Sequence, residues 1–146
     1  MLAPKTDCLF IPLLGTPASI GLARTLAGQK LNKWDCSGIL DDALLVVAEL
    51  VTNAAKATPL REIRFQLSRD AEGVIIAVWD SSSRLPEPKA VVELGLEDLD
   101  LAEESYDRNG GWGLPLVQAL STCCGYTRDP RGGKWVWARL AARHAP

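Results

Sequence analysis

The sequence lacks an excess of positive charge. Of its 146 residues, 16 are Lys or Arg and 18 are Asp or Glu, and the formal net charge of -2 is spread along the chain. Without a basic face, the chain has no electrostatic footprint for nucleic acid or an anionic membrane. We therefore expect a small-molecule or protein partner, with no direct contact to nucleic acid or membrane.

The sequence also lacks a long hydrophobic run. Its apolar N-terminal stretch is broken by Pro12 and is too short for a signal peptide's apolar region or a membrane span. We therefore expect a cytoplasmic protein. With 47% hydrophobic residues, the chain can bury a single core, so we expect one domain over residues 1–146.

The four cysteines lack the C-x-x-C spacing of a zinc site. In a reducing compartment they are most simply small core residues or free thiols. A redox-active pair at Cys123 and Cys124 is the alternative, which the rarity of cytosolic disulfides disfavours.

Apolar periodicity predicts alternating groups of strands and helices. The expected elements are a strand over 8–15, helices over 16–34 and 37–57, strands over 61–69 and 73–80, a helix over 113–125, and a hairpin over 125–142. This order predicts an α+β two-layer sandwich, whose mixed sheet is mostly antiparallel and carries its helices on one face.

Several residues are expected to set the boundaries of these elements. Ser37 is the expected N-cap of the second helix, and Thr58-Pro59 should end it. Gly125 should end the third helix, and residues 129–133 should form the last hairpin turn. The acidic segment 81–112 has weak periodicity, and a loop of this length is usually a functional lid or a disordered segment.

The second helix is apolar nearly all round, except for a narrow polar line. On a helical wheel, Leu45, Val46 and Leu50 flank this polar line. The broad apolar stripe comprises Leu40, Leu44, Val47, Ala48, Val51, Ala54 and Ala55, and the polar line comprises Asp42, Glu49, Asn53 and Lys56. The polar line is either a surface strip on a packed helix or the lining of a pocket.

The pocket interpretation assigns separate roles to two neighbouring residues. Glu49 and Asn53 are four residues apart, so their side chains lie one above the other and can share a ligand. Mg²⁺ is commonly held by one or two protein oxygens together with substrate phosphates. Asn53 can supply one such oxygen while Glu49 orients or deprotonates a nucleophile, which is the division of labour in phosphoryl transfer.

Two other segments are compatible with the same ligand. Gly110, Gly111 and Gly113 precede a predicted helix, where backbone N–H groups favour phosphate oxygens; the alternative is a flexible connector. Asp80 closes an apolar strand and needs a donor, for which an adenine amino group is one candidate. The alternative is a strand-end carboxylate that caps the following Ser-rich turn.

Three segments together resemble a known family. "ELVTNAAKA" resembles the N box, and "VWDSSSRLP" and "GGWGLPLVQAL" resemble the first and second glycine-box regions. In this order they resemble the histidine-kinase-like ATPases, in particular the short bacterial branch that includes anti-sigma-factor serine kinases. The similarity extends from about residue 15 to the terminal "GGKWVWARL".

The resemblance implies a Bergerat-type ATP site. Asn53 would hold Mg²⁺, Glu49 would be the general base, and Asp80 would accept from the adenine amino group. Lys56 would lie near the phosphates. The residues implied to cradle the nucleotide from the second glycine segment are Gly111, Gly113 and Leu114.

The sequence departs from the family pattern at three places. Residues 80–84 read DSSSR instead of D-x-G-x-G, so both glycines of the lid hinge are replaced. The last strand has Lys134 and Trp135 after Gly133, where many relatives have a threonine near the adenine. Trp112 stands where Arg is frequent.

The resemblance implies an ATP-binding anti-sigma regulator, with ATP and Mg²⁺ as cofactors, that sequesters a sigma factor and phosphorylates a serine of an antagonist protein. A homodimer is compatible with it. The alternative is a non-catalytic binding module of the same fold, which the lost lid glycines and missing threonine favour. A third reading is a structural polar strip that binds no nucleotide.

Overall fold

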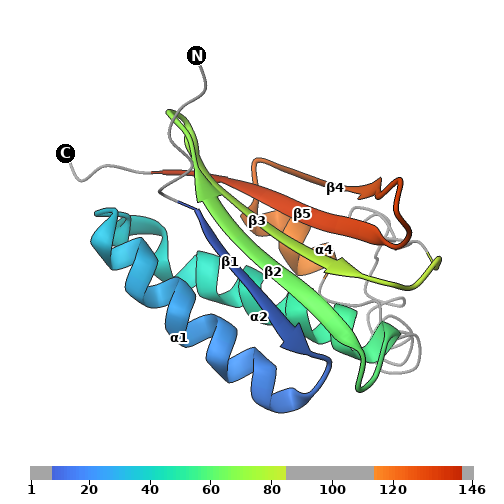
Figure 1. Cartoon of the computed structure of the whole chain (residues 1–146). Coiled ribbons are helices and arrows are strands. Elements are labelled where there is room, and N and C mark those ends of the chain that lie inside the picture. The colour runs from blue at the N-terminus through green and yellow to red at the C-terminus, as the bar shows by residue number, and fades with distance from the viewer. Residues whose placement is uncertain (1–7, 85–113, 143–146) are drawn as a thin grey trace, which may run out of the picture.

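The strands form one sheet that carries its helices on a single face (Figure 1). The computed structural model describes residues 8–84 and 114–142. Its elements are β1 (Leu9–Leu14), α1 (Pro17–Lys33), the 3-10 turn η2 (Ser37–Ile39), α2 (Leu40–Ala57), β2 (Glu62–Arg69), β3 (Gly73–Asp80), α4 (Leu114–Leu120), β4 (Cys123–Arg128) and β5 (Lys134–Ala141). The predicted α+β two-layer sandwich is confirmed. Most of the predicted lid, from residue 85 to 112, lies outside the described residues.

The sheet has the strand order β1-β2-β3-β5-β4, which places β3 at its centre. Each of these neighbouring pairs is antiparallel. The side chains of β2 and β3 alternate, and every second one faces the helices and is buried. The largest of these buried residues are Ile63, Phe65, Leu67, Val74, Ile76 and Val78.

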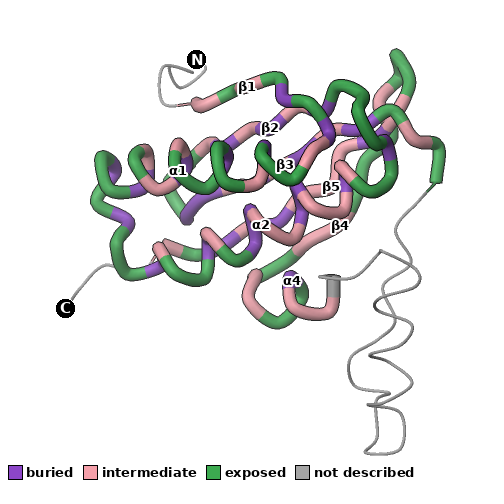
Figure 2. The backbone as a smooth tube through the Cα atoms, turned by 90° about the horizontal axis from the view of Figure 1, so that it is seen from below, coloured by how far each residue is buried: buried purple, intermediate pink, exposed green. Residues whose placement is uncertain are grey.

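Helix α2 lies between α1 and α4 and packs on β3 (Figure 2). Its buried stripe comprises Ala43, Val46, Val47, Leu50, Val51 and Ala54. The predicted stripe was therefore rotated: Val46 and Leu50 are fully buried, whereas Leu44 is only half-buried. The reason is that the sheet covers the middle of this stripe while Leu44 turns toward α1, where a Cβ at Gly28 would lie 3.9 Å from Leu44 Cδ2.

Two predicted helix boundaries were wrong. Ser37 begins η2 instead of capping α2, whose N-cap position is Ile39 with no side-chain cap hydrogen bond. Helix α4 ends at Leu120, and Gly125 lies within β4 opposite Trp137. There a Cβ would lie 3.1 Å from Trp137 Cζ2, so the close approach of the indole, and not a helix end, accounts for this glycine.

All four cysteines are free. Cys36 is buried, and this burial raises the pKa of its thiol. Cys123 and Cys124 are successive residues of β4, so their side chains point to opposite faces of the sheet. Within residues 8–84 and 114–142, no helix is long and apolar enough to cross a membrane.

Candidate functional site

The polar line of α2 faces the side on which α4 lies. Asp42 lines a cleft together with Ala119 and Leu120 of α4. Glu49 and Asn53 follow Asp42 by seven and eleven residues, so on a helix they point within about 20° of its direction. Both are half-buried, whereas Asp42 is exposed. The polar line therefore borders the core at Glu49 and Asn53, and neither residue lines the cleft at Asp42.

Lys56 is exposed in the last turn of α2. Helix α4 begins at Leu114, with Pro115 in its first turn as predicted. Gly111 and Gly113, which were predicted to cradle phosphate, lie outside the described residues. The structure thus places Glu49 and Asn53 on one face of α2. Leu114, the third residue predicted to cradle the nucleotide, is the first residue of α4.

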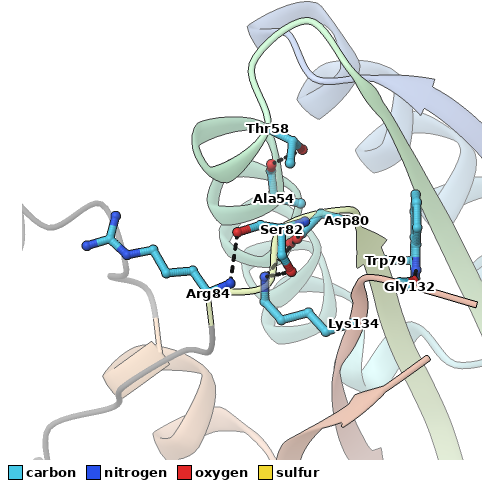
Figure 3. A network of polar contacts seen from close by, with 8 residues as sticks. All are labelled: Ala54, Thr58, Trp79, Asp80, Ser82, Arg84, Gly132 and Lys134. Carbon is cyan, nitrogen blue, oxygen red and sulfur yellow. Dashed lines mark hydrogen bonds and ion pairs between the residues drawn. The ribbon is translucent and has the colours of Figure 1, made fainter. Parts of the chain in front are cut away.

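Asp80 is the last residue of the central strand and is almost fully buried. Its Oδ1 accepts a hydrogen bond from the backbone N–H of Ser82 at 2.9 Å. Asp80 therefore caps the Ser-rich turn, as the alternative interpretation predicted, and its adenine role stays a prediction. Ser82 in turn accepts at Oγ from the backbone N–H of Arg84 at 3.0 Å, so the chain leaves the sheet through two successive side-chain caps (Figure 3).

Lys134 forms a buried ion pair with Asp80. It is the first residue of β5 and lies directly opposite Asp80 in the strand register. Its Nζ is 2.7 Å from Asp80 Oδ1, and the two side chains are only 6% and 3% exposed. Nζ also lies 3.5 Å from the carbonyl oxygen of Ser82. Figure 3 shows this group near the C-terminal end of α2, which carries Ala54, the residue that follows Asn53 in the sequence.

The turn before Lys134 is held by several hydrogen bonds. Trp79 Nε1 donates to the carbonyl oxygen of Gly132 at 3.0 Å, and Trp135 Nε1 donates to Asp129 Oδ2 at 3.1 Å. The backbone N–H of Arg131 and the indole of Trp135 hold the pKa of Asp129 below its ordinary value. These contacts fix the start of β5 and hence the position of Lys134.

Sequence reasoning missed Lys134 as a site residue. It noted that lysine follows Gly133 where a threonine is common, but assigned it no partner. A usable signal was present: β5 places Lys134, Val136, Ala138 and Leu140 on one face, and a lysine on a core-facing position needs an acidic partner. The direct register between Lys134 and Asp80 could only come from the structure.

The described residues thus form a sheet with a polar-lined helix on one face and a buried carboxylate at the end of its central strand. The family model described as the histidine kinase-like ATPase domain matches residues 14–140. The chain therefore belongs to the histidine kinase-like ATPase family, and this membership supports ATP binding. No curated protein matches the chain significantly.

Proposed function

We propose that this protein is an ATP-binding anti-sigma regulator that phosphorylates a serine of an antagonist protein. The observation that carries the proposal is the pair Glu49 and Asn53, which lie half-buried one helical turn apart on the α4 side of α2. Family membership supports the nucleotide, and the pair supplies the residue types that phosphoryl transfer uses.

Each residue of the pair has a distinct proposed role. Asn53 would supply one oxygen ligand to Mg²⁺, which neutralises charge on the phosphates when bound. Glu49 would accept the proton of the attacking serine hydroxyl. The serine oxygen forms a bond to the γ-phosphorus, the bond between that phosphorus and the β,γ-bridging oxygen breaks, and ADP leaves.

The partners and setting follow from the same proposal. The protein would bind a sigma factor and a serine-containing antagonist in the cytoplasm, as a monomer or a homodimer. The near-balanced charge of the chain is consistent with protein partners and with no direct role for nucleic acid.

A second candidate function is a non-catalytic module that holds a partner protein without phosphoryl transfer. The specific observation in its favour is the ion pair between Lys134 and Asp80, because Lys134 occupies Oδ1 of the carboxylate implied to read the adenine. The replacement of both lid-hinge glycines in residues 80–84 also favours the non-catalytic module.

A radiolabelled γ-phosphate transfer assay against candidate serine antagonists separates the two functions. Glu49→Gln should keep ATP binding and reduce transfer by about 10²–10⁴-fold, because only the proton acceptor is lost. Asp41→Asn is the matched control, since it neutralises an exposed carboxylate on the same helix outside the polar line and should leave transfer unchanged. Tight ATP binding without transfer to any candidate, together with normal sigma-factor capture by Glu49→Gln, would favour the non-catalytic module.

A further inference from the structure

We propose that Lys134 sets the base selectivity of this site, by removing the preference for adenine. The site would then take 6-amino and 6-oxo purine nucleotides with similar affinity. This inference rests on the proposed function, because it assumes that a nucleotide base lies at the Asp80 end of the site. It adds a residue that determines which nucleotides can bind.

The ammonium group of Lys134 is held in a fixed position. Lys134 Nζ contacts Asp80 Oδ1 at 2.7 Å and lies 3.5 Å from the carbonyl oxygen of Ser82. Its side chain is 6% exposed, and a buried ammonium is held close to its carboxylate because separating the charges there is costly. A base that approaches Asp80 therefore meets a carboxylate and an ammonium together.

The Asp80–Lys134 pair presents both hydrogen-bond donors and acceptors. An ammonium has three N–H donors, and the contacts to Asp80 and Ser82 use two of them. Lys134 and Ser82 both donate to Oδ1 of Asp80, so neither of these two hydrogen bonds uses Oδ2. The pair thus offers a donor beside an acceptor, whereas a lone carboxylate offers acceptors alone.

The two kinds of purine differ in the donors and acceptors along their polar edge. Adenine carries a donor at its 6-amino group and an acceptor at N1, whereas a 6-oxopurine carries an acceptor at O6 and a donor at N1. A lone carboxylate pairs with the adenine amino group and repels O6, so it discriminates because the wrong base leaves polar groups unpaired. The Asp80–Lys134 pair can satisfy either edge, and the discrimination is lost.

Calorimetric titration with ATP and ITP in the presence of Mg²⁺ tests the inference on the full chain. The two dissociation constants of the wild type should agree within about threefold, a difference of under 1 kcal/mol. Lys134→Met keeps most of the side-chain length but removes the ammonium, so ATP should now bind at least about tenfold more tightly than ITP. Lys33→Met removes an exposed lysine at the end of α1 and should leave the ratio unchanged.

Asp80→Asn provides the reciprocal test and serves if thermal unfolding shows that Lys134→Met does not fold. Its amide oxygen can still accept from Lys134 while its N–H₂ group donates to O6, so this variant should favour ITP over ATP. A wild type that prefers ATP more than about tenfold, with a ratio that Lys134→Met leaves unchanged, would overturn the role of Lys134 and leave the proposed function standing. Failure of wild type and variants to bind either nucleotide would refute the nucleotide site itself.

Discussion

Gly133 lies against the backbone carbonyl oxygen of Asp80, and no Cβ fits between them. A Cβ at Gly133 would also lie 2.7 Å from Trp79 Nε1, and Gly133 has a positive φ of 78°. Both constraints demand glycine immediately before Lys134. The tight approach of the last hairpin to the end of β3 is therefore what brings the lysine onto the carboxylate.

Gly133→Ala should destabilise the protein more than Gly132→Ala. Gly132 also has a positive φ, of 113°, but a Cβ there meets no atom within 4 Å. Alanine at Gly132 should cost only the backbone strain of about 1–2 kcal/mol, whereas at Gly133 the clash should raise the cost to about 3 kcal/mol or more. Urea unfolding measures both, and equal losses would show that β5 does not approach Asp80 this closely.

Removing one member of the buried ion pair should cost more than removing both. Asp80→Ala leaves the Lys134 ammonium buried without its carboxylate and should lower the free energy of unfolding by about 3–5 kcal/mol. The double variant Asp80→Ala, Lys134→Met removes both charges and should recover much of that loss. Denaturant unfolding of the four members of this mutant cycle checks the coupling, and simple additivity would argue against the pair.

Stability should depend on pH through Asp70. The hydrogen bond from Arg139, followed by that from the backbone N–H of Glu72, holds the pKa of Asp70 below its ordinary value. Its contribution is therefore present above about pH 4, and is lost as falling pH protonates the unfolded chain first and then the folded protein. Because Asp70 and Arg139 are 39% and 26% exposed, the effect should stay below about 1 kcal/mol.

Asp70→Asn tests this contribution in thermal unfolding at two pH values. The variant should be slightly less stable than the wild type at neutral pH, and this difference should shrink as the pH falls below about 4, because the lowered pKa of folded Asp70 makes the wild type lose its advantage there. A difference that persists or grows at low pH would contradict the assignment.

Much of the fold could be predicted because its signals are local. The alternation of Ile63, Phe65 and Leu67 predicted β2, and the glycine-rich turn over residues 129–133 predicted the last hairpin. The end of α4 could not be predicted from Gly125. The sequence alone does not distinguish a glycine that accommodates a facing indole from a glycine that ends a helix. The burial of Val46 and Leu50 depends on where the sheet covers α2.

The candidate site was predictable to the same extent. The spacing of Glu49 and Asn53 on one helix face is a property of the sequence, and the structure places both at the edge of the core. The partner of Asp80 was not predictable, since Lys134 is 54 residues away and reaches it through the register of β3 and β5.

Asn53→Ala should weaken the Mg²⁺-dependent part of nucleotide binding. The variant removes the proposed oxygen ligand of the metal while Asp80 and Glu49 remain. Calorimetric titrations with ATP should therefore show a smaller gain in affinity on adding Mg²⁺ than in the wild type. Thr52→Ala, which truncates a half-buried neighbour on the same helix, is the matched control and should keep the full gain.

Calorimetric titration of the wild-type protein with ATP, in Mg²⁺ and in excess chelator, shows whether the residues on α2 and at the end of β3 serve a nucleotide and a metal together. We expect saturable binding of one ATP per chain that is tighter in Mg²⁺ than in chelator. No heat of binding under either condition, for a protein shown to be folded by thermal unfolding, would contradict the account.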